Sequence, residues 1–168
     1  RVDAGAIKDA NNNDCAAITD GSALLATKWV KDATKPTLTG YDVDMTAETI
    51  TVTFSETVAG NKFDATALTL QSTKVKDGAT LSHKLTKLAT LKAKVDAKVD
   101  PSILTIVLGT ADANSIKLLP ALAESKTSTF VSFEAGFIED VDTNQIKPVE
   151  VASATNVGKY TQDSNKPV

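Results

Sequence analysis

The sequence predicts an all-β fold, an antiparallel two-sheet sandwich of immunoglobulin-like type with one short helix. Two observations predict this class. Several short segments alternate apolar and polar residues and are separated by turn-forming residues. Hydrophobic content is 42% while aromatic content is only 5%, so small and β-branched residues supply much of the interior.

The expected strands follow from the alternation. Residues 49–54 (TITVTF) give the clearest case, because apolar side chains fall on one face and three threonines on the other. Residues 103–108 (ILTIVL) are apolar on both faces, which is typical of a covered strand. Further expected strands are 37–45, 68–70, 129–133, 136–138 and 149–151. We expect one core between the sheets, containing Ile50, Val52, Phe54, Leu104, Ile106, Leu108, Phe133 and Ile138.

Residues 81–99 fit two patterns. Leu81 and Leu85 alternate with polar residues as in a strand, whereas the leucines from Leu85 to Leu91 also recur at helical spacing among lysines. We expect two strands of a long hairpin, because Asp100 and Pro101 then mark a break before the next strand.

One helix is expected after residue 109. Thr110 or Asp112 can cap its N-terminus, Ile116 and Leu119 share a face, and Pro120 ends it.

The first stretch of the chain repeats its last stretch at a constant offset. Residues 5–9 (GAIKD) return as residues 136–140 (GFIED), and 136 − 5 gives an offset of 131. Matches at the same offset include Asn13 with Asn144, Lys28 and Trp29 with Lys159 and Tyr160, and Lys35 and Pro36 with Lys166 and Pro167. We therefore expect a tandem array, in which residues 1–34 are the C-terminal strands of a preceding repeat and residues 35–166 are one complete module.

Composition excludes some classes of function. A net charge of −3 and a pI of about 5.1 argue against nucleic-acid binding driven by phosphate neutralisation. The single cysteine, Cys15, cannot form an intramolecular disulfide, and its repeat counterpart Ile146 favours the role of a small buried hydrophobe. The chain has no apolar run of the roughly 18 residues that a membrane span needs, so we expect none in this segment.

The sequence offers little for catalysis. His83 is the only histidine and is expected at an exposed or edge position of a strand, and one cysteine with one histidine cannot build a typical zinc site. Asp42, Asp44 and Glu56 read as a solvated face more readily than as an acid pair. We expect no enzymatic activity.

Asp140, Asp142 and Asn144 are the candidate metal ligands. Their alternate spacing places side-chain oxygens as in the first half of a calcium loop, but the glycine and bidentate glutamate of a full loop are absent. The repeat counterpart at Asp9 keeps the oxygens with one carboxylate fewer. A hairpin turn is the favoured role and calcium the alternative, so no cofactor is required.

Several motifs, in their order, resemble a family. They are residues 51–58 (TVTFSETV), 68–72 (LTLQS), 114–117 (NSIK), 137–140 (FIED) with Asn144, and 160–163 (YTQD). Together they resemble a repeat of very large secreted surface proteins of diatoms and related algae, which is similar to bacterial immunoglobulin-like adhesin modules. The chain departs from the family at Thr143, where a glycine is usual, and at residues 84–98, which are longer and more basic. The resemblance implies an extracellular, repetitive, load-carrying or adhesive protein and no catalytic residues.

These observations favour a structural module of an extracellular filament, cell wall or adhesive that assembles head-to-tail. Its expected partners are neighbouring copies or adjacent repeats, because residues 1–34 would otherwise expose apolar side chains. Those side chains are Val2, Ile7, Ile18, Leu24, Leu25 and Trp29. The alternative is a calcium-assisted module that binds carbohydrate or mineral through the Asp140 loop and the basic residues 84–98.

Overall fold

The computed structural model describes residues 1–74, 80–91 and 101–165. The chain divides into two compact units, Arg1–Asp32 (unit 1) and Ala33–Val168 (unit 2). All assigned helices and strands lie in unit 2, whereas the described backbone of unit 1 is held by isolated bridges and turns.

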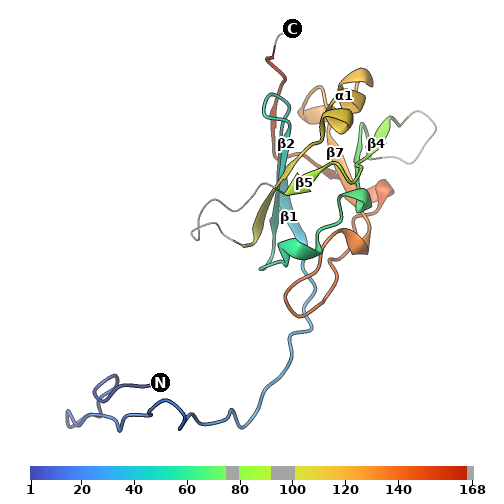
Figure 1. Cartoon of the computed structure of the whole chain (residues 1–168). Coiled ribbons are helices and arrows are strands. Elements are labelled where there is room, and N and C mark those ends of the chain that lie inside the picture. The colour runs from blue at the N-terminus through green and yellow to red at the C-terminus, as the bar shows by residue number, and fades with distance from the viewer. Residues whose placement is uncertain (75–79, 92–100, 166–168) are drawn as a thin grey trace. The chain divides into compact units, whose positions relative to one another are not determined.

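Unit 2 is mostly β, and its described residues form two sheets and one α-helix (Figure 1). The five-stranded sheet has the order β5-β6-β2-β1-β9, and the four-stranded sheet has the order β4-β3-β7-β8. The strands are β1 Leu38–Asp44, β2 Thr49–Phe54, β3 Leu68–Gln71, β4 Ser82–Lys84, β5 Thr90–Leu91, β6 Ile103–Val107, β7 Phe130–Phe133, β8 Thr155–Asn156 and β9 Lys159–Thr161.

Two sheets with one short helix agree with the prediction of a mostly β, two-sheet fold, but the prediction of antiparallel pairing fails for one strand pair. β1 and β9 pair in parallel, with Val43 opposite Tyr160, while the other strand pairs are antiparallel. A period of two identifies a strand but not its direction, so the alternation could not reveal this pair.

The core lies between the sheets and is built from the alternating apolar residues. Phe137 is 1% exposed and sits at its centre, with its ring 5.0 Å from Phe133, 5.6 Å from Phe63 and 6.4 Å from Phe54 between ring centroids. All the residues predicted to form the core are buried, namely Ile50, Val52, Phe54, Leu104, Ile106, Leu108, Phe133 and Ile138.

A buried tyrosine ties the two sheets together. Tyr41 lies on β1 in the five-stranded sheet, and its hydroxyl oxygen is 3.0 Å from the carbonyl oxygen of Thr129 and 3.1 Å from that of Thr155. Both carbonyls belong to the region of the four-stranded sheet. Burial raises the pKa of Tyr41 well above its usual range.

Helix α1 spans Thr110–Leu118 and begins differently from the prediction. Its N-cap is Gly109, without a side-chain capping bond, so neither Thr110 nor Asp112 caps the helix. Asp112 is instead fully buried and accepts hydrogen bonds from Thr86. A buried carboxylate needs such donors, and this long-range demand overrides local capping.

The predicted long hairpin over residues 81–99 is also wrong. β4 pairs with β3 in one sheet, and β5 pairs with β6 in the other. After β4 the Thr86 backbone and hydroxyl bind Asp112, and a turn closed by the Ala89 N–H to Thr86 carbonyl bond of 3.2 Å leads the chain to β5 in the other sheet. Residues 92–100, which hold most of the lysine-rich stretch, lie outside the described residues.

Unit 1 has a few local contacts and much exposed apolar surface. A bridge joins Val2 to Ile18, and both of these side chains are half-buried. The exposed apolar side chains include Ile7, Leu24, Leu25 and Trp29. Cys15 is half-buried.

We predict that Phe54→Ala lowers the free energy of unfolding by about 3 to 5 kcal/mol, because it removes a ring from the aromatic cluster and leaves a cavity. Urea denaturation followed by circular dichroism measures this change. Leu118→Ala is the control, since Leu118 is 80% exposed, and its effect should stay within about 0.5 kcal/mol. Equal losses for the two variants would contradict the core described here.

Candidate functional site

The loop with the candidate metal ligands is a hairpin turn organised by one carboxylate. Asp140 is buried, and its Oδ1 accepts the backbone N–H groups of Asp142 and Asn144, each at 2.8 Å. Its Oδ2 accepts the side-chain amide of Asn144 at 2.7 Å. The backbone closes the turn, because Asp140 N–H donates to the Asn144 carbonyl at 3.1 Å. The carboxylate therefore holds the loop through three donors of the loop itself.

Unit 1 contains the same hairpin, atom for atom, 131 residues earlier. Asp9 Oδ1 accepts the N–H groups of Asn11 and Asn13, each at 2.9 Å, and Oδ2 accepts the Asn13 side-chain amide at 2.9 Å. The Asp9 N–H donates to the Asn13 carbonyl at 3.1 Å. The hydrogen bond from the Asn13 side chain is the main cause that lowers the pKa of Asp9. The hairpin thus keeps its hydrogen bonds in acid until the pH falls through this lowered pKa.

The correspondence extends beyond the hairpin. The bridges of unit 1 recur in unit 2 at the same offset, as do individual backbone hydrogen bonds. The bridge of Val2 with Ile18 matches that of Phe133 with Val149, the bridge of Lys8 with Asp14 matches that of Glu139 with Gln145, and the Cys15 N–H to Ile7 carbonyl bond of 2.9 Å matches the Ile146 N–H to Ile138 carbonyl bond of 3.0 Å.

Burial distinguishes the two copies. Ile138 is 1% exposed in unit 2, whereas its counterpart Ile7 is 70% exposed. Ile146 is fully buried, whereas its counterpart Cys15 is only half-buried. Unit 1 therefore has the local geometry of the closing part of unit 2 without the apolar cover that this part receives in unit 2.

Thr143 occupies a backbone conformation that suits glycine. Its φ is 71°, in the left-handed region, and its unit 1 counterpart Asn12 has a φ of 67°. A β-branched side chain is strained there, whereas asparagine tolerates the region and glycine is free in it. The turn geometry thus gives a physical reason for a glycine at this position.

The calcium alternative depends on other oxygens near Asp140. A second carboxylate, that of Glu56, places an oxygen within 4.8 Å of an Asp140 carboxylate oxygen. Sequence reasoning had left Glu56 on a solvated face, but the side chain is half-buried. Asp142 contributes its backbone N–H to the turn.

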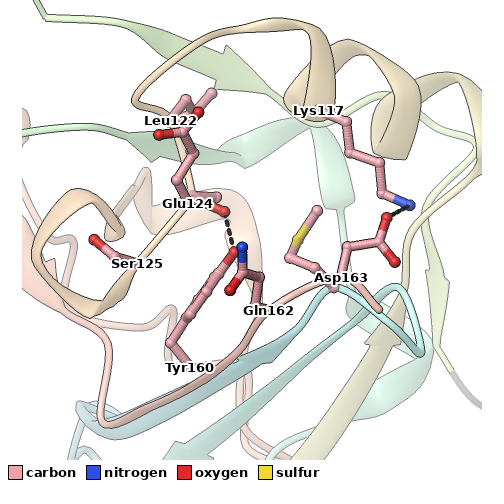
Figure 2. Close-up of a pocket in the computed structure, with 9 residues that line it drawn as sticks. Lys117, Leu122, Glu124, Ser125, Tyr160, Gln162 and Asp163 are labelled. Atoms are coloured by element: carbon pink, nitrogen blue, oxygen red, sulfur yellow. Dashed lines mark hydrogen bonds and ion pairs between the residues drawn. The ribbon is translucent and has the colours of Figure 1, made fainter. Parts of the chain in front are cut away.

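A pocket opens beside β9 and the segment that follows it (Figure 2). It is lined by Tyr160 and by the loop that follows α1. The Tyr160 hydroxyl donates to the carbonyl of Ala123, and burial raises the pKa of this tyrosine. Ala121 and Ala123 have φ values of 66° and 50°, so the loop holds two non-glycine residues in the left-handed region.

An ion-pair network lies beside this pocket. Lys117 Nζ is 2.7 Å from Glu48 and 2.9 Å from Asp163, and Figure 2 shows the latter contact. The hydrogen bond to Glu48, followed by that to Asp163, raises the pKa of Lys117. The hydrogen bond between Lys117 and Asp163 is also the main cause that lowers the pKa of Asp163. The network joins α1 to the segment that follows β9.

His83 serves a structural contact. It lies on the edge strand β4, as expected, but its side chain is only 16% exposed because Nε2 is 2.9 Å from Asp112 Oδ1. Asp112 also binds Thr86, so the cluster joins β4 to α1. Sequence reasoning missed this role of Asp112, since an aspartate in the first turn of a helix is also a normal capping residue.

Asp42 and Asp44 do not form an acid pair. Asp42 Oδ1 accepts the Lys159 N–H at 2.8 Å, and Asp44 Oδ1 accepts the Ala47 N–H at 2.8 Å. Asp42 thus connects β1 to β9, and Asp44 stabilises the turn that follows β1.

Comparisons with known proteins give one distant similarity. No protein-family model matches the chain, and no curated protein matches it significantly. Among solved structures, domains 1–6 of the surface layer protein SbsC match it with 12% identity and a TM-score of 0.41. The match covers 81% of this chain and 14% of that chain, so the chain spans a small part of its length. At this TM-score the similarity supports no conclusion about function.

We predict that Asp140→Asn destabilises unit 2 by about 1 to 3 kcal/mol, because the amide would face three hydrogen-bond donors with a donor of its own. Thermal melting with chemical denaturation measures the loss. Asp9→Asn is the matched control, since it breaks the same hydrogen bonds in unit 1 and should leave the unit 2 transition unchanged.

Thermal melting of the unaltered chain, in chelator and in calcium, distinguishes a hairpin turn from a calcium site. The melting temperature of the unaltered chain is expected to be equal in excess chelator and in calcium. A melting temperature that falls by many degrees in chelator and recovers with calcium would assign the Asp140 carboxylate to a metal.

We predict that Thr143→Gly stabilises unit 2 by about 0.5 to 1 kcal/mol, because it removes the Cβ from a residue with positive φ. Thr143→Ala is the control, since it keeps a Cβ and should give a smaller gain. Both changes are measured by urea denaturation. A loss of stability in Thr143→Gly would show that the threonine side chain contributes more than its conformation costs.

Proposed function

We propose that the chain is part of a repetitive extracellular filament, cell-wall or adhesive protein, in which unit 2 is one immunoglobulin-like repeat. In this proposal unit 1 is the closing part of the preceding repeat, and the protein carries load without catalysis or a cofactor. The observation that carries the proposal is the recurrence of the same hairpin, bridges and hydrogen bonds at an offset of 131 residues.

The exposed side chains of unit 1 support a cover supplied by a neighbour. Ile7, Leu24, Leu25, Trp29 and Val30 are each at least 70% exposed. Such a density of apolar surface on a short segment favours association, because burying it removes apolar area from water. A preceding repeat would supply the cover that unit 2 supplies to its own closing part.

A different repeat fits unit 1 better than a second copy of unit 2. Ala6 stands where unit 2 has Phe137, and Val2 where it has Phe133. If unit 1 packed in place of residues 132–165 of unit 2, these smaller side chains would leave cavities in the aromatic cluster. Thr27 stands where unit 2 has Gly158, whose added Cβ would lie 3.0 Å from Asp42 Oδ1. We therefore propose an adjacent repeat of the same polypeptide, with its own matching core, as the partner.

A calcium-assisted module for carbohydrate or mineral is the second candidate. The observation that favours it is the proximity of the Glu56 and Asp140 carboxylates. The chelation experiment described above tests its metal.

We predict that adding residues 35–131 of this chain before Arg1 folds unit 1 into a second module, once its core is matched. The matched chain carries Val2→Phe, Ala6→Phe and Thr27→Gly. Its Cys15 thiol should react with a maleimide at least about tenfold more slowly than in the 168-residue chain. The reason is that Cys15 would take the position of Ile146, which is fully buried in unit 2.

The same extended chain without the three replacements is the control. It should protect Cys15 less, because cavities of aromatic size oppose its closure. The single Trp29 gives a second readout, since its emission should shift to the blue as it leaves water. Equal thiol reactivity in the matched chain and the 168-residue chain would refute the proposal.

A further inference from the structure

The first and last strands of unit 2 are neighbours. β1 is the first strand of unit 2, β9 is the last strand among the described residues, and the two pair in parallel with Asp44 opposite Thr161. Because the strands point the same way, β1 begins at one end of unit 2 and β9 leads out at the other (Figure 1). A pull on the chain before β1 and after β9 therefore slides these two strands past each other along their axes.

Close contacts reinforce the beginning of this strand pair. Gly158 N–H donates to the Tyr41 carbonyl at 2.8 Å, and Lys159 N–H donates to Asp42 Oδ1 at 2.8 Å. A Cβ at Gly158 would lie 3.0 Å from Asp42 Oδ1 and 3.2 Å from the Tyr41 oxygen. The glycine thus permits the backbones to approach, and a side chain supplies a bond that the short ladder lacks.

Beyond the strands, the pairing continues through a threonine. Met45 N–H donates to the Thr161 carbonyl at 2.9 Å. Thr46 Oγ1 then donates to the Gln162 carbonyl at 2.9 Å and accepts the Ser164 N–H at 3.0 Å. This hydroxyl takes the place of a backbone partner for a segment that has already left the sheet.

Two more contacts fasten the same segment. Asn165 Nδ2 donates to the Thr46 carbonyl at 2.9 Å, so Thr46 holds residues 162–165 through its side chain and its backbone. Asp163 is paired with Lys117 on α1 at 2.9 Å. The described residues after β9 are therefore attached to the rest of unit 2 as far as Asn165.

We propose that β1, β9 and Thr46 form a mechanical clamp, which resists tension applied through the two ends of unit 2. The inference rests on the proposed function, since a clamp matters in a filament or adhesive under load. Bonds loaded in shear must break together before the strands can slide, whereas bonds loaded by peeling break one after another. Resistance to force is governed by the rate of unfolding, so bonds that break before the barrier to unfolding set the strength.

β9 is the element that must yield first. It lies at the edge of the five-stranded sheet, and within the part of the chain that the structure describes its strand partner is β1 alone. β1, by contrast, is also paired along its length with β2. Separation of β9 from β1 exposes the core behind Val43 and Tyr41, after which the remainder of unit 2 unfolds.

Single-molecule pulling of the full 168-residue chain by its two ends tests the clamp. Thr46→Val keeps the shape of the side chain but removes the hydroxyl, and it should lower the rupture force of unit 2. Thr51→Val is the matched control, because Thr51 lies in the same sheet and its hydroxyl is 3.3 Å from that of Thr105, away from β9. Asn165→Ala is a second variant on the clamp and should act as Thr46→Val does.

A change of pulling direction provides the sharper comparison. With Cys15→Ala as background, a handle on Ala47→Cys and a handle at the C-terminus load β9 from one end, so that it peels from β1. Ala47 is exposed, and it follows Thr46, which contacts the segment after β9. The rupture force should fall several-fold relative to pulling by the two ends, and Thr46→Val should lower it less than in shear.

Equal rupture forces in the two directions, or equal forces for Thr46→Val and Thr51→Val, would overturn the clamp. These results are independent of the thiol-protection experiment. A weak clamp with a protected Cys15 would leave the repeat array standing, and a strong clamp with a reactive Cys15 would remove the array but keep the mechanical property.

Discussion

The fold of unit 2 depends on the burial of residues 133–146 against the elements that precede them in unit 2. Phe133, Phe137, Ile138 and Ile146 come late in the chain, yet they are among its most buried side chains. Without them the aromatic cluster would lose its centre and β3 would lose one of its two partners, β7. The corresponding segment of unit 1 keeps the hairpin and the bridges without this burial, so local hydrogen bonds are compatible with its conformation in both units.

Polar groups at the edges of the core connect elements that packing alone leaves loose. Tyr41 spans both sheets, Asp112 joins β4 to α1, and Asp42 joins β1 to β9. Tyr41 and Asp112 are buried and need hydrogen-bond partners, and Asp42 accepts a backbone N–H of β9. The neutral form of Tyr41 is favoured in the folded state, since burial raises its pKa. The stability that this contributes is present below the pKa of about 10 of an unfolded tyrosine and is lost as the pH rises through the folded value.

Alternation in the sequence was sufficient to identify β1, β2, β3, β6, β7 and the core, because Ile50, Val52 and Phe54 can bury together only on one face of a strand. The strands expected at 136–138 and 149–151 are wrong, since 3₁₀ turns span Ala135–Phe137 and Val151–Ser153. Alternation was also insufficient for topology. Nothing in the period of residues 37–45 or 159–161 reveals that these strands pair in parallel, and Thr46 carries no local sign of its contacts with Gln162 and Ser164. The repeat was visible because its residues recur in register. The role of Asp112 was not, because its partners are 26 and 29 residues away.

Unit 1 and the corresponding part of unit 2 differ in side-chain size at several positions, and this difference matters for folding next to a similar domain. Neighbouring domains of similar sequence misfold by exchanging segments during folding, and the risk grows when the segments are interchangeable. Ala6 and Val2 cannot fill the space of Phe137 and Phe133, and Thr27 does not fit where Gly158 lies against Asp42. In the proposed array, this divergence of adjacent segments would act against exchange, so that each segment would close on its own repeat rather than on the next one.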